Sequence, residues 1–458
     1  MKVIICGAGQ VGSGIARHLA SEKNDVTVID VVPTLVHRVS EQLEVRGLVG
    51  FASHPDVLEA AGCKDADMIV AVTHSDEVNM VACQIAHALF ETPMKIARVR
   101  NQSYLDPAWS ALYAPERLSI DVIISPEIEV ARAIERRLQV PGAVDMIPFA
   151  GGRVRLVAVH CASDCPVVNT PLHQLTELFP DLNITVVAVV REGGLFVPKD
   201  EDSLQPGDDV YFTAAHDRVA RGMAAFGHEE REARRMIIAG GGNIGLYLAR
   251  MIEENAPGVS LKVIEYNRER AQVLADRLSR AVVLHGDVLD PEILEEAAVA
   301  AGEAIVAVTN DDEVNILASL LAKRSGCRKS LTLVNNTAYW PLLTSLGVDV
   351  VVSPYESTIS TILQHIRRGR IHSVHSLRGG LAEVIEADAL ETSVIVGRPL
   401  REIELPAGII IGAVVHEDAV VIPRGSTVIE PGDRVIVLAV PKMVKKMEQI
   451  FAVRLEFF

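Results

Sequence analysis

The sequence contains an internal repeat that spans the whole chain, and this duplication restricts the possible folds more than any single motif. The first twenty residues, MKVIICGAGQVGSGIARHLA, are matched by RRMIIAGGGNIGLYLARMIE at positions 234–253. VAVTHSDEVN (70–79) is repeated as VAVTNDDEVN (306–315), with eight of ten residues identical. Two further pairs keep the same order: VIISPE (122–127) with VVSPYE (351–356), and LQPGDDVYF (204–212) with IEPGDRVIV (429–437). The 458 residues therefore encode two copies of one structural unit.

Each copy has two parts. The first part, residues 1–140 and 233–372, alternates apolar strands such as KVIICG, DVTVID, ADMIVAVT, KIARVR and DVIIS with helical patterns. This alternation predicts an α/β fold with two Rossmann-like domains, each a doubly wound parallel sheet. The second part, residues 143–228 and 373–455, has shorter β-rich runs separated by Gly-Gly and Pro-Gly-Asp turns. It predicts a small α+β domain after each Rossmann-like domain.

An amphipathic helix is expected between the two parts of each copy. PEIEVARAIERRLQV (126–140) begins with Pro and Glu, which suit a first helical turn, and its apolar residues recur at helical spacing. PYESTISTILQHIRRGR (354–370) occupies the same place in the second copy. Two roles remain open for this helix: it covers the core of its domain, or it docks against a partner copy.

Charge and cysteine content exclude several classes of protein. The net charge of −16 disfavours nucleic acid and anionic lipid as partners, because both attract clustered Lys and Arg. The six cysteines show no spacing typical of disulfide, redox or zinc pairs, so we expect buried free thiols in a reducing cytoplasm.

No segment of the sequence is expected to reach or cross a membrane by itself. The first strand begins at Lys2 or Val3, so we expect no targeting segment. The longest apolar stretch, Leu405–Val415, is much shorter than the roughly 20 residues that span a bilayer. The expected location is cytoplasmic, with membrane association only through another protein.

The glycine turn GAGQVG has the spacing of a dinucleotide-binding site. Gly7 permits the tight turn after the strand, Gly9 lets the backbone approach a pyrophosphate, and Gly12 lets the helix pack closely. The positive end of the helix dipole then faces the phosphates. The second copy carries Gly240, Gly242 and Gly245 in the same relation.

A carboxylate follows each turn at the end of the second strand. Asp30 ends DVTVID, where it can accept hydrogen bonds from ribose hydroxyls and would repel a 2′-phosphate, which favours NAD over NADP. Glu265 stands at the same place in the second copy. The alternative is that Asp30 only caps the turn.

Polar residues also end the strands MIVAVT and AIVAVT, at the edge where open α/β sheets bind ligands. Thr73 and His74 in the first copy, and Thr309 and Asn310 in the second, are expected to line the middle of the nucleotide. The acidic residues that follow precede a helix, so we interpret them as caps and dipole partners rather than ion ligands: Asp76, Glu77, Asp312 and Glu313.

The two copies differ where a ligand would be discriminated. Arg98 in KIARVR can reach a phosphate or ribose, whereas the aligned residue of the second copy is Leu333. Asp287 of the second copy follows Gly286, whereas the first copy has Phe51 there. The two sites are therefore predicted to bind differently.

A dehydrogenase would need an acid or base beside the hydride and a substrate pocket. The segments after each Rossmann-like domain offer no His-Asp, Tyr-Lys or metal-ligand arrangement that we can place there, and His160 and His173 look isolated. We therefore expect no catalytic residues, no metal and no enzyme activity.

The glycine turns, SHPDVLEAAGCKDADMIVAVTHSDEVNM, LAKRSG, SPYESTIS, GRIHSVHSLRGGLAEVIEA and TVIEPGDRVIV resemble the TrkA family of potassium uptake regulators over the whole chain. The modules of that family are called RCK or KTN domains. The resemblance implies a homotetramer that binds NAD or NADH, with ATP or ADP also open. It would sit under a TrkH or TrkG type membrane subunit, peripheral on the inner face of the membrane, and gate potassium uptake.

By that resemblance, the site residues form two sets. The first set is Gly7, Ala8, Gly9, Gln10, Val11, Gly12, Asp30, Thr73, His74 and Arg98. The second set is Gly240, Gly241, Gly242, Asn243, Ile244, Gly245, Glu265, Thr309 and Asn310, with Leu333 in place of the arginine. The alternatives are a NAD-dependent oxidoreductase with duplicated Rossmann domains and a nucleotide sensor without a membrane partner.

Overall fold

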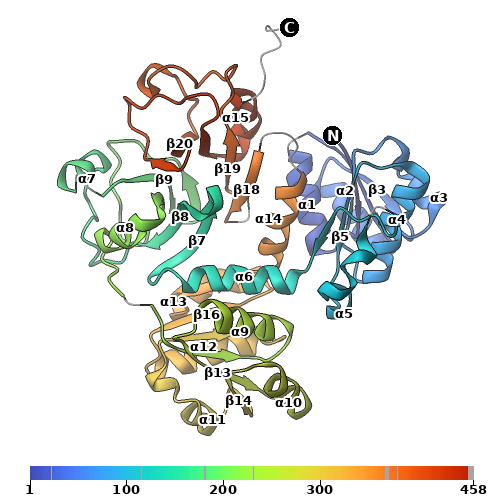
Figure 1. Ribbon diagram of the computed structural model, residues 1–458, viewed down its shortest axis with the longest axis horizontal. Helices are drawn as coiled ribbons and strands as arrows, with labels where there is room; N and C mark the ends of the chain where they lie inside the picture. The colour runs from blue at the N-terminus through green and yellow to red at the C-terminus, as the bar shows by residue number, and fades with distance from the viewer. Residues whose placement is uncertain are drawn as a thin grey trace. The chain divides into compact units, whose positions relative to one another are not determined.

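A computed structural model of the chain describes residues 1–21, 23–114, 116–179, 182–230, 232–366, 371–378 and 380–451 (Figure 1). These residues form two compact units. Unit one consists of residues 1–130 together with helix α14 (Pro354–Ile366), and unit two contains residues 131–353 and the chain from residue 371 onward. Helix α6 (Pro126–Leu138) begins in unit one and ends in unit two.

Unit one is built around a six-stranded sheet in which every pairing is parallel. Its strands, in spatial order, are β3 (Arg46–Val49), β2 (Asp25–Asp30), β1 (Lys2–Cys6), β4 (Met68–Ala71), β5 (Met94–Arg98) and β6 (Val122–Ile124). The helices are α1 (Gln10–Ser21), α2 (Pro33–Gln42), α3 (Pro55–Ala60), α4 (Asp76–Phe90) and α5 (Gln102–Leu105). The order is that of a doubly wound sheet with its topological switch between β1 and β4, as the sequence predicts.

Successive residues of β1 point to opposite faces of this sheet, and both faces are buried. Val3 and Ile5 join a core with Ile15 and Leu19 of α1, whereas Ile4 and Cys6 join a second core with Met80 and Cys83 of α4. The continuous apolar runs noticed in the sequence therefore reflect burial on two sides.

Helix α14 completes the core on the α1 face of unit one. Ile359, Ile362 and Leu363 are buried in the same cluster as Ile15 of α1. The contact is close because α1 has Gly14 there: a Cβ at this position would lie 2.1 Å from the Tyr355 hydroxyl oxygen. From the sequence, this helix either covers a core or docks against a partner copy, and in the structure α14 covers a core. That core belongs to the domain of the other repeat.

Unit two contains the second six-stranded parallel sheet. Its strands are β14 (Val282–His285), β13 (Ser260–Glu265), β12 (Arg235–Ala239), β15 (Ala304–Ala307), β16 (Lys329–Leu333) and β17 (Val350–Val352). Its helices are α9 (Asn243–Asn255), α10 (Arg268–Arg277), α11 (Pro291–Glu296), α12 (Asp312–Arg324) and α13 (Trp340–Leu346).

The end of α6 is bonded to this second Rossmann-like domain. Glu135 accepts a hydrogen bond from the Asn255 side chain of α9 at 2.7 Å. Lys329 of β16 donates to the carbonyl of Arg137 at the end of α6, at 3.5 Å, and to that of Ala143 at 3.1 Å. A cation at a helix C-terminus also suits the helix dipole.

The two small domains are antiparallel five-stranded sheets with short helices, as expected for α+β appendages. The first has β10 (Gly194–Phe196), β9 (Ile184–Arg191), β11 (Asp209–Ala215), β8 (Val154–His160) and β7 (Ala143–Phe149), with α7 (Leu172–Leu178) and α8 (Val219–Ala225). The second has β18 (Ile371–Leu377), β19 (Ala382–Asp388), β22 (Arg434–Ala439), β20 (Ile409–His416) and β21 (Ala419–Val421), with α15 (Val444–Phe451). The apolar stretch 405–415 supplies most of β20.

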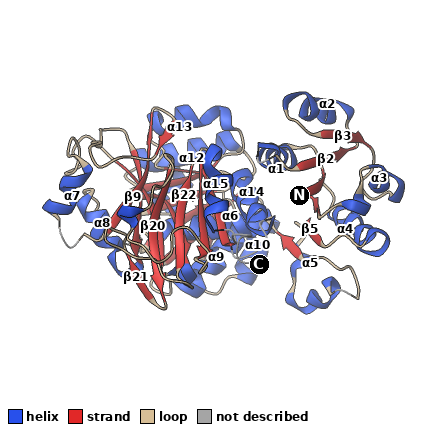
Figure 2. Ribbon diagram, turned by 90° about the horizontal axis from the view of Figure 1, so that it is seen from above, coloured by secondary structure: helices blue, strands red, loops and turns tan. Residues whose placement is uncertain are grey.

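These two small sheets pack against each other and share one apolar core. Strands β9 and β20 lie side by side at this contact (Figure 2). Val187 and Tyr211 of the first sheet lie in the same buried cluster as Ala413 and Ile436 of the second. The buried Thr213 hydroxyl donates to the Gly412 carbonyl at 2.6 Å across this contact.

All six cysteines are buried and unpaired, as predicted. Burial raises the pKa of the Cys83 thiol well above its ordinary range, which keeps this thiol protonated and unreactive. Among the described residues, no helix combines the length and apolarity that crossing a membrane requires.

Replacing Thr213 with Val is expected to weaken the contact between the small sheets. The substitution keeps the shape but leaves the Gly412 carbonyl without its buried donor, a loss of about 1–3 kcal/mol. Thermal unfolding of the full chain measures this loss of stability as a lower midpoint temperature. The exposed Thr34 provides the control Thr34→Val, which should leave the midpoint unchanged; equal midpoints for all three proteins would contradict the role given to Thr213.

His375 makes the same contact sensitive to acid. Its ring lies edge-on to Phe149, with centroids 5.1 Å apart, and burial followed by the nearby Arg136 lowers the pKa of His375 to about 3. The unfolded chain has the ordinary histidine pKa of about 6.5, so protonation favours unfolding. The stabilising contribution is complete above about pH 6.5 and is lost as the pH falls toward the folded pKa.

His375→Phe should therefore keep the ring contact and remove part of the acid sensitivity. At pH 5 the difference in unfolding free energy amounts to about 2 kcal/mol. Unfolding midpoints at pH 7.5 and pH 5 test this, with the exposed histidine variant His37→Gln as control. The same loss of stability at pH 5 in wild type and His375→Phe would rule out this origin.

Candidate functional site

The first glycine turn connects β1 to α1 with the geometry that each glycine was predicted to permit. Gly7 has φ +114°, and a Cβ there would lie 3.0 Å from the Val72 carbonyl oxygen of the neighbouring strand's end. A Cβ on Gly12 would lie 1.8 Å from the Gly7 carbonyl oxygen, so the helix packs against the turn itself. Gly9 faces open space, with nothing within 4 Å of a Cβ position.

The second turn, between β12 and α9, repeats this geometry. Gly240 has φ +106°, and a Cβ on Gly245 would lie 2.0 Å from the Gly240 carbonyl oxygen. Gly242 is the N-cap of α9 and, like Gly9, faces open space. Gln10 and Val11 open α1, as Asn243 and Ile244 open α9, so each of these helices begins beside the open position at Gly9 or Gly242.

The carboxylates predicted to bind ribose hold the turns in place. Asp30 accepts from the Ala8 backbone N–H at 2.6 Å through one oxygen and from Val32 N–H at 2.9 Å through the other. Glu265 accepts from Gly241 N–H at 2.7 Å and from Asn267 N–H at 2.8 Å. A carboxylate oxygen can accept more than one hydrogen bond, so a carboxylate that caps the turn can also bind a ribose.

The longer carboxylate of the second copy comes with a smaller turn residue. Gly241 stands where the first copy has Ala8, and a Cβ on Gly241 would lie 2.1 Å from Leu274 Cδ1 and 2.9 Å from Glu265 Oε2. Glu265 is one methylene longer than Asp30. The two copies therefore reach the same backbone geometry with different side-chain volumes.

A buried asparagine joins the strand ends in each copy. The Asn79 side chain accepts from the Thr73 N–H and hydroxyl at 2.8 and 2.7 Å and donates to the carbonyls of Thr73 and Arg98. Asn315 makes the same four bonds with Thr309 and Leu333. Sequence reasoning missed this role, although the repeated DEVN carried the signal. His74 and Asn310 follow the threonines and are exposed.

The acidic residues after these strands lie in the first turns of α4 and α12, as predicted for dipole partners, but they are not the N-caps. The N-caps are Ser75, which accepts from Val78 N–H, and Asp311, which accepts from Val314 N–H. Asp76 instead accepts from the N–H groups of Arg100 and Asn101, which connects the start of α4 to the loop after β5. Asp312 makes the equivalent bonds to Asn335 and Asn336.

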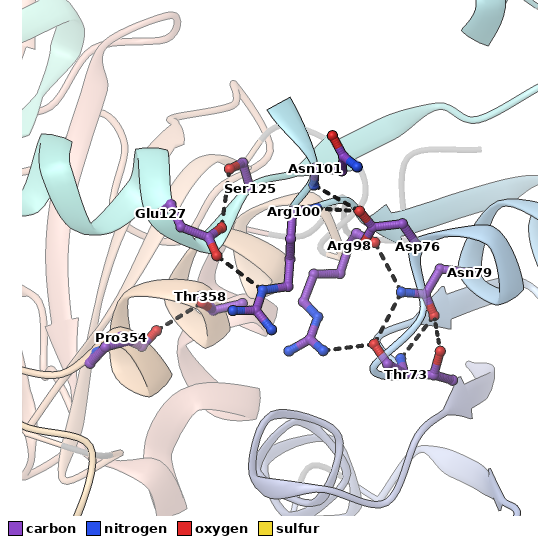
Figure 3. A network of polar contacts seen from close by, with 10 residues as sticks. All are labelled: Thr73, Asp76, Asn79, Arg98, Arg100, Asn101, Ser125, Glu127, Pro354 and Thr358. Atoms are coloured by element: carbon purple, nitrogen blue, oxygen red, sulfur yellow. Dashed lines mark hydrogen bonds and ion pairs between the residues drawn. The ribbon is translucent and has the colours of Figure 1, made fainter. Parts of the chain in front are cut away.

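Arg98 carries a positive charge that no carboxylate in the described chain pairs with. Its guanidinium donates to the Thr73 carbonyl at 2.6 Å, and its buried Nε has no partner among the described residues. Burial, and then the nearby Arg100, lower the pKa of Arg98. Figure 3 shows this network, in which Arg100 pairs with the buried Glu127 at 2.9 Å. An anionic group beside Arg98 would satisfy both its charge and its free donor.

The prediction that His160 and His173 are isolated is wrong. His160 Nδ1 lies 2.7 Å from Asp209 Oδ1, a contact that raises the pKa of His160, and Arg378 pairs with the other oxygen of the same carboxylate. His173 contacts the Asp200 carbonyl at 3.0 Å. The His160–Asp209 contact joins the paired strands β8 and β11 of the first small sheet, and the Arg378–Asp209 ion pair joins this sheet to the second small domain. No group of three or more metal-ligating side chains occurs among the residues that the structure describes.

Comparison with protein families matches all four domains. Residues 3–126 and 236–354 match the TrkA-N domain, and residues 156–227 and 384–452 match the TrkA-C domain. The Trk system potassium uptake protein TrkA of Azorhizobium caulinodans is 53% identical over 458 residues, covering 100% of both chains. The protein of the same name from Halomonas elongata is 44% identical, again over 100% of both.

Solved structures support the fold. The structure titled "GsuK channel bound to NAD" has a TM-score of 0.59 at 20% identity and covers 99% of this chain and 79% of its own. The crystal structure of the GsuK RCK domain has a TM-score of 0.58 at 19% identity, covering 99% and 95%. Two Rossmann-like domains, each followed by a small antiparallel domain, are thus confirmed.

Replacing the turn residue of one copy with that of the other should show that the two turns leave different space for a side chain. Gly241→Ala overpacks the turn against Leu274 and should cost about 1–3 kcal/mol. Adding Leu274→Val, which introduces the residue found at the aligned Val39, should recover most of the loss. Thermal unfolding midpoints measure both variants, and Ala8→Gly is the control, with a cost of about 1 kcal/mol. Wild-type stability in the single Gly241→Ala variant would refute the clash.

Proposed function

The chain belongs to the family of Trk system potassium uptake proteins TrkA, and from this membership we propose that it regulates potassium uptake in response to a bound nucleotide. The membership places the chain in potassium transport, and the expectation of a non-enzymatic protein is confirmed. An oxidoreductase with duplicated Rossmann domains is therefore set aside.

The observation that carries the proposal is the repeated glycine turn with its carboxylate and its open helix N-terminus. Nothing lies within 4 Å of a Cβ position at Gly9 or Gly242, so a pyrophosphate can approach the backbone there. Asp30 and Glu265 stand where ribose hydroxyls would bind, and both disfavour a 2′-phosphate. The ligands proposed are NAD or NADH, with ATP or ADP as adenine nucleotides of the same chemistry.

In the first site, the proposed contacts are those predicted from the sequence. The backbone from Gly7 to Gly12 cradles the phosphates, Asp30 accepts from the ribose, and Thr73 and His74 line the middle of the ligand. The unpaired Arg98 supplies the charge that a phosphate needs. In the second site Gly240–Gly245, Glu265, Thr309 and Asn310 have the same roles, with Leu333 in place of the arginine.

The proposed partner is a TrkH or TrkG type membrane subunit, beneath which a homotetramer of the chain sits on the cytoplasmic face of the membrane. A nucleotide changes potassium flux only if it binds two shapes of this assembly with different affinity. The domain boundaries proposed for the repeat are 1–140, 143–228, 233–372 and 373–455.

Calorimetric titration of the full chain with NAD, NADH, ATP and ADP tests nucleotide binding. Asp30→Ala should weaken binding at the first site at least tenfold, and Glu265→Ala at the second, because each removes a charged hydrogen-bond acceptor. Asp25→Ala removes a carboxylate from the other end of the same strand and should bind as wild type does. Absence of binding to wild type would reject the proposal.

Regulation is tested by potassium flux through the chain reconstituted with its membrane subunit, with each nucleotide added in turn. The expected result is a flux that changes with at least one nucleotide and loses this response in Asp30→Ala. A flux that is the same with and without every nucleotide would reject gating, and failure to co-purify with any membrane subunit would favour the sensor alternative.

A further inference from the structure

The two proposed nucleotide sites differ at two positions. At one position the first copy has arginine and the second has leucine, and at the other the first has leucine and the second has arginine. On the fifth strand of the parallel sheet, Arg98 of the first copy corresponds to Leu333 of the second. On the helix after the second strand, Leu35 corresponds to Arg270: each is the third residue of its helix, α2 or α10. Leu35 packs against the apolar core of unit one, whereas Arg270 turns toward the glycine turn.

The Arg270 side chain lies over the N-terminus of α9. Its Nε donates to the Gly241 carbonyl at 2.7 Å, and one terminal nitrogen lies 3.4 Å from the Asn243 side-chain oxygen. Gly241 and Asn243 flank Gly242, the residue that faces open space. The guanidinium is therefore beside the position that the glycine turn prepares for phosphates.

The position of Arg270 within α10 is unfavourable for its charge, although the side chain bonds the helix to the glycine turn. Arg270 lies in the first turn of the helix, where the dipole disfavours a cation, and Asn267 already caps that turn by accepting from the Arg270 N–H at 2.9 Å. Among the described residues no carboxylate forms an ion pair with the Arg270 guanidinium. The next residue after Glu265 is Tyr266, which is 75% exposed and offers an aromatic face to a base.

The two arginines stand on opposite sides of the switch point between the first and fourth strands of the sheet. In a Rossmann-like site, the adenosine lies on the side of the second strand, and the other half of a dinucleotide lies across the switch. Arg98 is on the far side, where a second nucleoside or a terminal phosphate would reach. Arg270 is on the adenosine side, and the far side of its site holds the apolar Leu333, which is 4% exposed.

We infer that Arg270 and Leu333 together make the second site selective for a nucleoside diphosphate, whose terminal phosphate carries the higher charge, over a dinucleotide. This inference rests on the nucleotide-binding function proposed above. The guanidinium contributes its charge to the diphosphate on the glycine turn, while Leu333 offers nothing polar to a second nucleoside. The first site has the reverse preference because its arginine acts on the far half of the ligand.

Calorimetric titration with ADP and with NAD distinguishes these roles in four variants of the full chain: Arg270→Leu, Arg270→Lys, Arg98→Leu and Arg268→Leu. Arg270→Leu installs the residue of the first copy and should weaken ADP binding about tenfold at one class of sites. Arg270→Lys keeps the charge without the planar fork and should recover part of this loss. Arg98→Leu should weaken NAD binding and leave ADP binding at the second site unchanged.

The matched control is Arg268→Leu, which removes the same charge from the exposed start of the same helix and should bind both ligands as wild type does. The inference is overturned if Arg270→Leu binds ADP with wild-type affinity, or if Arg98→Leu rather than Arg270→Leu removes the ADP class. A wild type that binds neither ligand would instead reject the proposed function, and with it this inference.

Discussion

The first Rossmann-like domain depends on an apolar surface supplied by the other repeat. Ile359, Ile362 and Leu363 of α14 are buried against α1, so the residues from 1 to 130 do not bury this face by themselves. Gly14 allows the approach because any side chain there would meet Tyr355. Because α14 is on the same chain, its effective concentration at this face is high. The duplicated chain therefore buries the face within one molecule, whereas a single copy would need a second molecule to cover it. The shared core of the two small sheets follows the same principle.

Within this frame the repeats keep the backbone contacts and change the side chains that face the open space. Asn79 and Asn315 make the same four hydrogen bonds, and the carboxylates of Asp30 and Glu265 hold the same backbone N–H of each turn. An unsatisfied buried amide is costly, which resists change at such positions. The side chains at Arg98 and Leu333, and at Leu35 and Arg270, differ between the copies without changing these shared bonds, and under the proposed function they set the ligand preference of each site.

The sequence was sufficient to predict the parallel strands, the glycine turns and the carboxylates, because each is defined by a local pattern. It did not reveal β3 or β7: the RGLV of β3 is short and only half-buried, and β7 is interrupted by Pro148. Nor could the amphipathic pattern of α14 identify what it covers, since periodicity indicates a buried face but not its partner. The His160–Asp209 contact depends on the pairing of β8 with β11, a long-range register.

The position of Arg98 connects the first site to helix α6. Arg100 lies close enough to Arg98 to disfavour the charge of Arg98, and Arg100 is held by Glu127 in the first turn of α6. Under the proposed function, a phosphate beside Arg98 would relieve this repulsion and change the electrostatic balance at Glu127. The same helix ends at the Arg137 carbonyl, which Lys329 of the second Rossmann-like domain contacts. A single helix is thus bonded at its start to Arg100, beside Arg98, and at its end to Lys329 of the second Rossmann-like domain.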